Sequence, residues 1–431
     1  MKSKKFVLAG LVLLAITMVL LPLAGCKNDS VSETPAAKLV SITVTPPERT
    51  VYSVEQSFDP TGMVVTATYD DKSQREVTGW ETNFDEVVAE KGLGKEVTVS
   101  YKERETAKTT TFTVTVFPKE VKVLTGYTSP NNTGSKWTYV AFGEWPQTIK
   151  DASVDVDETK SKEMGIFTYY LGRDGNYYVK IVAEPYEDTY TYSDGNPVEN
   201  KVVYFKVEPI KWRVLTEDYK APDGKSTGNA LLLAESILTG GIKWADSSNN
   251  YMQSYIRRWL NGNSGTGETS DYNGDAGFLQ TAFTQSAQDL IELTTVDNSV
   301  ASTIPSEITD EDLDSYWNSG ENQYASDTPT KDKVFLLSEE EATTLNSGFA
   351  AYNAAGQGNT RIRVTTDYAK ATGAQQDSTE GYGGWWWLRS PYYYIGDRAR
   401  VIGSDGDADY YINYVYYTNG GVFPALSISL Q

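Results

Sequence analysis

The side chains that most enzymes use for catalysis are scarce in this 431-residue sequence. It has no histidine and a single cysteine, Cys26, which rules out a Ser-His-Asp triad, a Cys-His pair, a Cys/His zinc site and an intramolecular disulfide. It also lacks a Walker A loop, a GxGxxG motif and a Ser-x-x-Lys motif. The composition does not exclude hydrolysis of glycosidic bonds, which needs only a pair of acidic side chains. A binding protein is favoured over an enzyme.

Tyrosine is concentrated in one segment, residues 390–420. Eight of its 31 residues are tyrosines, against 22 in the other 400. Tyrosine combines a large apolar ring, a hydroxyl group and only two χ angles, and binding loops are rich in it for that reason. The segment predicts either a ligand-binding face or ordinary packing, in which about half of the rings would point inward from strands. The candidate ligand-binding residues are Tyr392, Tyr393, Tyr394, Tyr410, Tyr411, Tyr414, Tyr416 and Tyr417.

Three aspartates spaced two residues apart, Asp405, Asp407 and Asp409, lie in the same segment. They are weak candidates for calcium binding. An EF-hand loop would also need glycine at its sixth position and glutamate at its twelfth, and these positions hold Tyr410 and Tyr416. An acidic turn between strands is therefore favoured, and the sequence predicts no cofactor.

The overall charge argues against two classes of binding partner. The chain carries 38 Lys and Arg against 58 Asp and Glu, a net charge of −20. This excess argues against nucleic acid and against an anionic membrane surface as partners. Hydrophobic residues make up 39% of the chain, which is enough for the cores of two or three folded domains.

Residues 1–25 have the pattern of an export signal. Three lysines occur within the first five residues, an apolar run covers residues 6–23, and small residues precede Cys26. Leu23-Ala24-Gly25-Cys26 resembles the lipobox of bacterial lipoproteins. The resemblance implies cleavage before Cys26, diacylglycerol on its sulfur, and anchoring in the lipid bilayer by two or three acyl chains. The alternative is a simple transmembrane anchor with an incidental cysteine.

These features predict a lipid-anchored protein of the cell envelope, at the outer membrane or the cell surface. Residues 26–37 are polar and are expected to form a tether. Residues 38–118 contain short runs of alternating hydrophobicity separated by turn signals, which predict an all-β sandwich. The strands are expected over residues 39–45, 63–69, 96–101 and 111–116.

The same stretch, with Tyr52 and the run Phe58–Tyr69, resembles a bacterial Ig-like domain. The resemblance implies a spacer or stalk, with adhesion by this domain as the alternative. Residues 119–135 are rich in turn formers and are expected to be a linker. Residues 136–431 are expected to form one large domain.

Within the large domain, hydrophobic periodicity predicts several elements. Trp385, Trp386 and Trp387 are expected in the core, and Arg389 is expected to pair with a buried carboxylate or to cap a carbonyl. Ser338 is expected to cap a helix that begins with three glutamates. Strands are predicted over 203–215, 230–234 and 334–337, a helix over 252–262, and loops over 151–165, 186–200, 262–277 and 300–330.

Seven motifs in the large domain resemble a bacterial domain of unknown function found in secreted and lipid-anchored proteins. The same motifs resemble the variable proteins of diversity-generating retroelements. That resemblance implies an α+β, C-type-lectin-like fold related to the formylglycine-generating enzymes. Formylglycine chemistry is excluded because it needs cysteines, and Phe423 stands where the closing motif usually has arginine. The motifs are Gly143–Gln147, Ile210–Leu215, Ile256–Asn261, Asp332–Ser338, Arg363–Ala369, Trp385–Pro391 and Gly421–Leu426.

The retroelement resemblance adds a third interpretation of the tyrosine-rich segment. Residues 390–420 contain no Glu, Lys, Gln, Met or Trp. These residue types cannot be reached from an AAC or AAT codon by replacing its adenines, and the retroelements diversify their proteins by adenine-specific mutagenesis. A diversified segment therefore stands beside a fixed binding surface and ordinary packing.

Taken together, the patterns predict a surface-exposed lipoprotein that recognises an extracellular protein or glycan through its tyrosine-rich C-terminal face. Two alternatives remain open. One is a carbohydrate hydrolase that uses an Asp/Glu pair, and the other is a structural envelope lipoprotein without a ligand.

Overall fold

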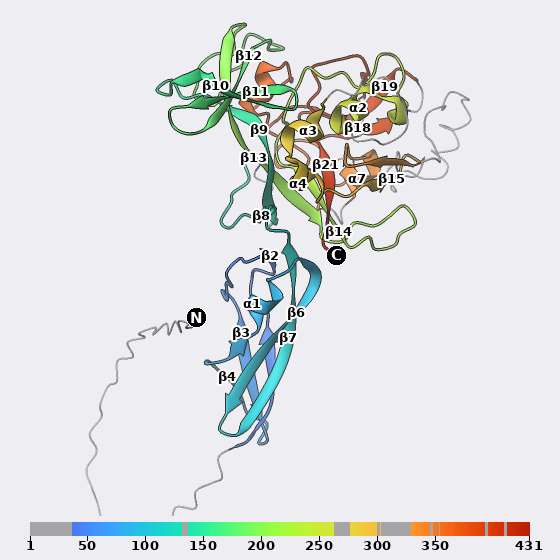
Figure 1. Ribbon diagram of the computed structural model, residues 1–431. Coiled ribbons are helices and arrows are strands. Elements are labelled where there is room, and N and C mark those ends of the chain that lie inside the picture. The colour runs from blue at the N-terminus through green and yellow to red at the C-terminus, as the bar shows by residue number, and fades with distance from the viewer. Residues whose placement is uncertain are drawn as a thin grey trace, which may run out of the picture.

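Two bodies of β-structure, joined end to end, make up the described part of the chain (Figure 1). An N-terminal module comprises residues 37–118, and a larger C-terminal domain begins at residue 122. Strands dominate both bodies, and the helices are few and short. The computed structural model describes residues 37–131, 137–262, 276–299, 302, 329–344, 348–352, 354–392, 395–408 and 412–431.

The N-terminal module is a sandwich of two sheets, as the alternating runs predict. One sheet has the strand order β1-β3-β4, and the other has the order β2-β7-β6-β5. Val65 and Ala67 on β3 and Val97 and Val99 on β6 are buried between the sheets, because alternate side chains of a strand point to one face. The elements are β1 (Leu39–Thr45), β2 (Val51–Ser53), β3 (Val64–Tyr69), β4 (Gln74–Glu76), β5 (Glu81–Thr82), α1 (Phe84–Val87), β6 (Gly92–Glu103) and β7 (Thr106–Phe117).

The C-terminal domain is built on a nine-stranded sheet with the order β10-β11-β12-β13-β14-β21-β17, in which β9 pairs with β13 and β8 pairs with β9. β13 is the longest strand and bonds to β12, β9 and β14 along different parts of its length. Ala230–Ala234 of β14 are all buried, which fits an apolar central strand covered on both faces. The strands are β8 (Lys122–Val123), β9 (Tyr139–Ile149), β10 (Val156–Met164), β11 (Phe167–Gly172), β12 (Tyr177–Val182), β13 (Val202–Thr216), β14 (Asn229–Ala234), β17 (Val334–Phe335) and β21 (Ala425–Ser429).

Short helices and two small sheets pack beside the large sheet. The helix predicted over 252–262 begins later, at Tyr255, where Ser254 caps it by accepting a hydrogen bond from Arg257 N, and it ends at Asn261, before Gly262 (φ +51°). The predicted cap at Ser338 is confirmed. Ser338 and Glu341 form a capping box. No helix among the described residues is long and apolar enough to cross a bilayer. These elements are η1 (Tyr251–Gln253), α2 (Tyr255–Asn261), α3 (Phe278–Ala282), α4 (Gln285–Gln288), β15 (Thr294–Val296), β16 (Thr330–Asp332), α7 (Glu339–Thr343), α8 (Asp367–Ala371), β18 (Trp386–Pro391), β19 (Arg398–Ile402) and β20 (Ile412–Tyr414).

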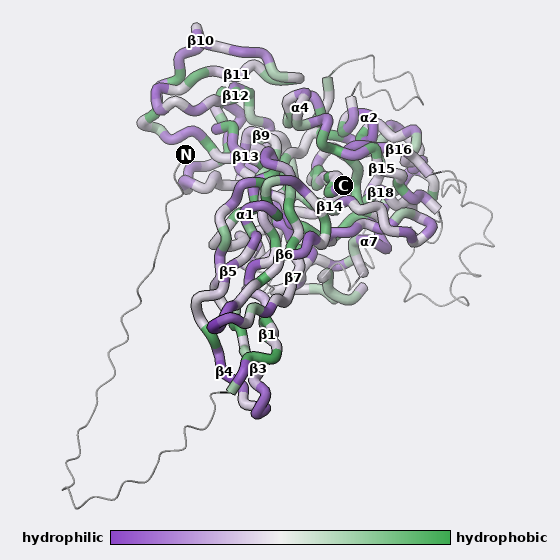
Figure 2. The backbone as a smooth tube through the Cα atoms, turned by 60° about the horizontal axis from the view of Figure 1, so that its bottom comes forward, coloured by the Kyte–Doolittle hydropathy of each residue, from purple (hydrophilic) through white to green (hydrophobic). Residues whose placement is uncertain are grey.

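The loop prediction for residues 151–165 is wrong, because this range contains β10. β10 lies at the edge of the large sheet and pairs only with β11 there. Figure 2 shows it as a largely hydrophilic strand, and none of its side chains is buried. A polar edge strand carries no hydrophobic alternation, so the periodicity that predicts strands was absent.

The predicted linker also differs from expectation, because part of it belongs to the large sheet. β8 bonds to β9 through Lys122 and Val123. Ser53 of the N-terminal module donates a hydrogen bond to Val121 O (2.7 Å) and accepts one from Val123 N (2.8 Å), and its side chain is buried. The two bodies therefore share a bonded joint, and residues 119–123 are not a free connection.

Candidate ligand-binding site

The tyrosine-rich segment is held by the three-stranded sheet β18-β19-β20. All six residues of β18 are buried, and Trp386 and Trp387 have no exposed area, which confirms that these tryptophans belong to the core. Gly420, at the end of the segment, lies against them. A Cβ atom on Gly420 would be 2.2 Å from Trp387 Nε1, so no larger residue fits without displacement. The segment is thereby fixed to close-packed tryptophans.

Four of the eight candidate tyrosines belong to the described residues. Tyr392 and Tyr414 are half-buried, whereas Tyr416 is 48% exposed and Tyr417 is 39% exposed. None of the four is a core residue, so the expectation that about half would point inward is not met by this subset. The remaining sequence-predicted site residues lie outside the described residues: Tyr393, Tyr394, Tyr410, Tyr411, Asp409 and Cys26.

Three of these rings form a compact group, the tyrosine cluster, which consists of Tyr414, Tyr416 and Tyr417. The ring centroids lie 5.1 Å apart for Tyr414 and Tyr416, 5.4 Å for Tyr414 and Tyr417, and 5.3 Å for Tyr416 and Tyr417. Arg398 holds Tyr414 in place, because its Cζ lies 4.3 Å from the ring centroid and its Nη2 donates to the hydroxyl at 2.8 Å. The cluster therefore has two exposed rings, Tyr416 and Tyr417, which pack against the Tyr414 ring that Arg398 holds in place.

Val415 lies between Tyr414 and Tyr416 of the cluster and is buried. Its side chain has no exposed area. Its backbone N–H donates a hydrogen bond to Asp397 O (3.0 Å), and its carbonyl oxygen accepts one from Ala245 N (2.9 Å). Val415 and Tyr416 form the turn that follows β20, and beside the inward Val415 the Tyr414 side chain is half-buried and that of Tyr416 is exposed. Partial desolvation, then the neighbouring tyrosines, raise the pKa of the Tyr416 phenol, so its hydroxyl remains a hydrogen-bond donor at neutral pH.

An open groove with a volume of about 710 Å³ begins where the cluster ends. The end of β12 and the following turn line it, together with Thr418 and Asn419, directly after Tyr417. Gly241 and residues 371–373 complete the lining. The lining residues are Ile181, Val182, Glu184, Pro185, Tyr186, Gly241, Ala371, Thr372, Gly373, Thr418 and Asn419. Hereafter "the groove" means this set.

Backbone hydrogen bonds fix the walls of the groove. Gly241 N donates to Thr418 O (2.8 Å), and Glu184 N donates to Ala371 O (2.7 Å). Gln375 connects the groove to the core, because its Oε1 accepts from both Asn419 Nδ2 and Trp385 Nε1 at 3.0 Å. The groove is therefore largely pre-formed, as small-molecule sites usually are.

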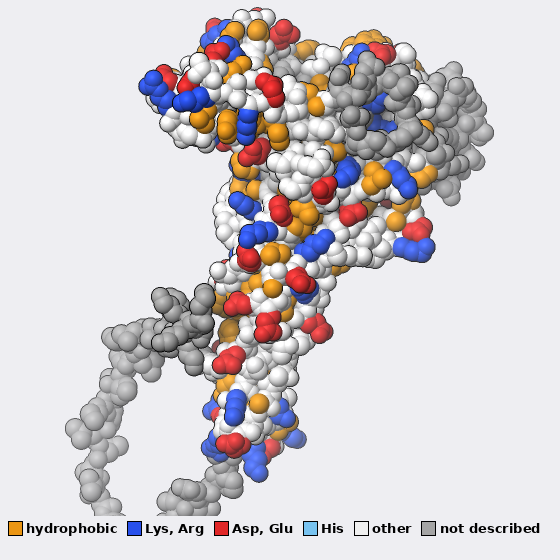
Figure 3. All heavy atoms as spheres, viewed as in Figure 1, with side chains coloured by type: hydrophobic (Ala, Val, Ile, Leu, Met, Phe, Trp, Pro, Cys, Tyr) orange, Lys and Arg blue, Asp and Glu red, His pale blue; other side chains and the backbone are white. Residues whose placement is uncertain are grey.

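The side chains of the groove offer a mixed apolar and polar surface. Val182 is 59% exposed and Tyr186 is 50% exposed. The Glu184 side chain is exposed, and among the described residues its carboxylate has no hydrogen-bond or ion-pair partner. Among the described residues that line the groove there is no Lys or Arg. On the face shown in Figure 3, acidic and basic side chains of the described residues are interspersed.

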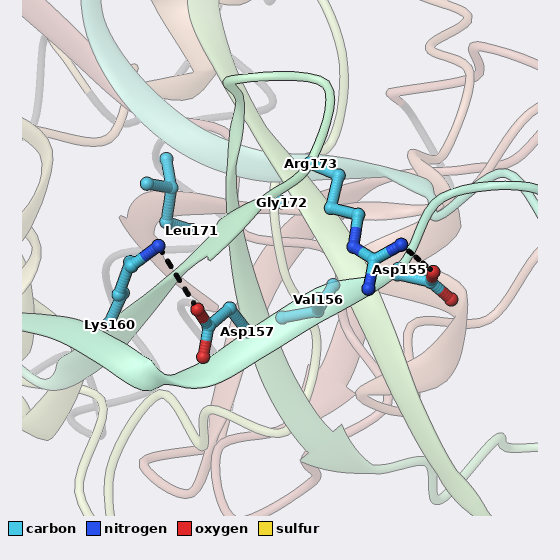
Figure 4. Close-up of a pocket in the computed structure, with 7 residues that line it drawn as sticks. All are labelled: Asp155, Val156, Asp157, Lys160, Leu171, Gly172 and Arg173. Atoms are coloured by element: carbon cyan, nitrogen blue, oxygen red, sulfur yellow. Dashed lines mark ion pairs between the residues drawn. The ribbon is translucent and has the colours of Figure 1, made fainter.

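Two other cavities are less suited to a ligand. The one at the β10–β11 hairpin, about 440 Å³, is shown in Figure 4. Its charged side chains neutralise one another, with Arg173 3.1 Å from Asp155 and Lys160 3.3 Å from Asp157, and they are largely exposed. The other, about 560 Å³, is lined by amides such as Asn131 and by a single acid, Glu380. The described linings of these two cavities contain no residue of the tyrosine cluster and no direct neighbour of it in sequence.

Buried ion pairs stabilise the core behind the site. Arg389 Nη1 lies 2.5 Å from Glu341 Oε2 and also donates to Leu336 O (2.8 Å), which confirms the predicted pairing and carbonyl cap. Burial alone would raise the pKa of Glu341, but the Arg389 charge and its hydrogen bond lower it overall. Arg257 and Asp332 form a second such pair at 2.8 Å. These residues are structural and face no cavity described above.

Phe423, the departure from the closing motif, lies against a buried arginine. The Arg363 guanidinium carbon is 5.2 Å from the Phe423 ring centroid, and Trp386 packs on the same ring at 4.8 Å. Burial, followed by the nearby Arg213 charge, lowers the pKa of Arg363 to about 9. Phe423 thus meets the buried Arg363 through a cation–π contact.

The acidic turn has the predicted form. Asp405 Oδ1 accepts a hydrogen bond from Asp407 N at 3.1 Å, and Gly406 between them has φ +83°. Among the described residues no group of three or more His, Cys, Asp or Glu side chains is placed to hold a metal ion. Because Asp409 is not described, calcium binding here stays a weak prediction.

Sequence reasoning missed the groove. Its residues come from segments around 181–186, 241, 371–373 and 418–419. No motif connects these segments, and the predicted 186–200 loop gave no reason to single out Tyr186. The one available signal was the run Ile181-Val182 ahead of Pro185-Tyr186, apolar residues at a strand end where solvent exposure was not expected.

Comparison with known families identifies a part of each body. Residues 45–116 match the family described as a bacterial Ig-like domain (group 3), and residues 227–430 match a domain of unknown function, DUF6273. No curated protein matches the chain. The chain therefore consists of a bacterial Ig-like domain followed by a C-terminal region that carries the DUF6273 domain.

Proposed function

We propose that this chain is a lipid-anchored surface protein that recognises an extracellular protein or glycan through the tyrosine cluster and the adjoining groove. The observation that carries the proposal is the exposure of Tyr416 and Tyr417 directly after fully buried Val415. Exposed tyrosines on a rigid support lose little conformational entropy on binding, which favours recognition.

The arrangement of the two bodies supports a stalk role for the Ig-like domain. The described chain begins at the end of this domain that lies away from the C-terminal domain, and β8 leaves from the opposite end (Figure 1). A lipid on Cys26 would therefore be separated from the binding face by the length of the Ig-like domain. Short helices beside one central sheet support a C-type-lectin-like C-terminal domain, and the restricted composition of residues 390–420 supports their diversification by a retroelement.

A hydrolase finds less support in the groove. Among the described residues that line it, Glu184 is the only acid. Retaining and inverting glycosidases need two carboxyl groups that flank one bond. A binding role requires no such pair.

Anchoring is tested by replacing the acylated residue. We expect Cys26→Ser to move the protein from the membrane fraction to the soluble fraction, because no acyl chain can attach to serine oxygen in the lipoprotein pathway and two or three chains are needed for stable anchoring. Carbonate-washed membranes are compared by immunoblot for the two proteins. A Cys26→Ser protein that stays in the washed membranes contradicts lipid anchoring.

Recognition is tested with the exposed rings. Purified residues 27–431 are labelled, and their binding to a panel of bacterial and mammalian cells is titrated by flow cytometry. We expect Tyr416→Ala or Tyr417→Ala to weaken binding by about 30-fold, which corresponds to about 2 kcal/mol for an interface anchor.

Ile166→Ala is the matched control, because Ile166 is 44% exposed and lies between β10 and β11, outside the groove. It should leave binding unchanged. Equal binding by the wild-type chain and both tyrosine variants would refute recognition through the cluster.

A further inference from the structure

We infer that the groove binds an uncharged glycan, a chain of neutral sugars, with Glu184, Tyr186 and Asn419 as its contact residues. The inference deepens the proposed function and rests on it, since it names the ligand class of the same face. The groove volume, about 710 Å³, lies within the range of small-molecule sites, about 300–1,000 Å³.

The polar groups of the groove match sugar hydroxyls. Glu184 provides a carboxylate with no partner among the described residues, and a carboxylate accepts strong hydrogen bonds from hydroxyl groups. The Asn419 amide is held by Gln375 at 3.0 Å, so its carbonyl oxygen has a fixed direction. Thr418 adds a hydroxyl that both donates and accepts. A ligand rich in hydroxyls satisfies these groups, whereas an apolar peptide face would leave them unpaired.

The apolar side chains of the groove match the other face of a sugar ring. Tyr186 is 50% exposed and Val182 is 59% exposed, and both line the groove where β12 ends. The axial C–H groups of a pyranose are weakly positive and favour the negative face of an aromatic ring. Gly241 (φ +75°) and Gly373 (φ +91°), which also line the groove, have positive φ angles that favour glycine.

Charge excludes acidic sugars. The described lining of the groove contains no Lys or Arg, and its one acidic side chain, Glu184, is negative. The nearby Lys243 is paired with Asp246 at 2.5 Å. The chain as a whole carries a net charge of −20. Sialylated and sulfated glycans would meet uncompensated repulsion, so the structure favours neutral ones.

The experiment measures glycan binding directly. Labelled residues 27–431 are applied to an array of neutral, sialylated and sulfated oligosaccharides, and affinities for the best neutral oligosaccharide are obtained by calorimetry. Binding is also measured to soluble neutral polysaccharides and to glycoproteins before and after enzymatic deglycosylation. This comparison shows whether the recognised sugar is free or linked to protein. We expect neutral binders, and at least tenfold weaker binding when the same oligosaccharide carries sialic acid or sulfate.

Paired variants separate the groove from the rest of the surface. Glu184→Gln, Tyr186→Ala and Asn419→Ala should each weaken the affinity at least tenfold. Glu187→Gln and Tyr170→Ala are the matched controls, because Glu187 is an exposed neighbour and Tyr170 lies on β11, and neither lines the groove. They should bind as the wild-type chain does, and thermal melting checks that every variant is folded.

Two results would overturn the inference. One is glycan binding that the three groove variants leave intact. The other is the absence of any neutral binder while Tyr416→Ala still reduces binding to cells, in which case recognition stands and its ligand is a protein. If the chain binds neither cells nor glycans, the proposed function fails together with the inference.

Discussion

We expect Trp386→Ala to lose about 3–5 kcal/mol of unfolding free energy, the cost of deleting a fully buried large aromatic side chain. Trp386 has no exposed area, its ring packs 4.8 Å from Phe423, and its Nε1 donates to Arg361 O at 3.1 Å. Removing the ring leaves a cavity and an acceptor without its donor. Urea denaturation of residues 27–431, followed by tryptophan fluorescence and circular dichroism, measures the loss.

Tyr416→Ala is the informative comparison. Its ring is about half exposed, so we expect a stability change within about 0.5 kcal/mol, while binding falls as described above. Trp386→Ala should therefore mainly reduce stability, whereas Tyr416→Ala should mainly reduce binding. If alanine at Tyr392, Tyr414, Tyr416 and Tyr417 destabilises the chain as much as Trp386→Ala does, the segment is ordinary core packing and the recognition proposal loses its main support.

The second large effect is expected at Glu235, where Glu235→Ala should cost about 3–5 kcal/mol. Glu235 is 1% exposed and lies 3.4 Å from Arg213, which has no exposed area. It also accepts hydrogen bonds from Asn131 Nδ2 (2.8 Å) and from the Ser129 hydroxyl. Alanine leaves the buried Arg213 charge uncompensated and releases the segment that precedes residue 132. Chemical denaturation gives the stability loss.

Limited proteolysis gives a second readout for Glu235. Because Ser129 and Asn131 lose their acceptor, the variant should be cleaved faster near them than the wild-type chain is. Glu235→Gln keeps an acceptor for these hydrogen bonds but removes the charge. Compared with Glu235→Ala, it should therefore recover most of the resistance to cleavage but less of the lost stability. Glu199→Ala, which removes a largely exposed pair with Lys201, should change stability by no more than about 0.5 kcal/mol. An unchanged melting curve for Glu235→Ala would show that the buried pair contributes little.

Features that depend on local pattern were predictable from the sequence. The alternating runs of the Ig-like domain, the cap at Ser338 and the apolar β14 all express rules that act over a few residues. Trp386 and Arg389 were placed correctly because a large apolar ring and a charge that needs a partner each have few favourable environments.

Features that depend on the assembled fold were not predictable. β10 is polar on both faces because it is an exposed edge, and β8 is only two residues long, so neither has a periodic signal. The groove is formed by segments from Ile181 to Asn419 that meet only in three dimensions. The tyrosines were identified from composition alone, which did not show that Val415 between them is buried.

The joint at Ser53 determines how the molecule would carry tension. If the chain is anchored and binds as proposed above, a ligand fixed to another cell would pull on the C-terminal domain while the lipid anchor would hold the other end. The load would enter at β1 and leave through β7 from opposite ends of the sandwich, along the strands (Figure 1). Hydrogen bonds between antiparallel strands run perpendicular to the strands, so such a load acts on many of them together rather than opening them one by one. The Ser53 bonds to Val121 and Val123 would share that load across the joint.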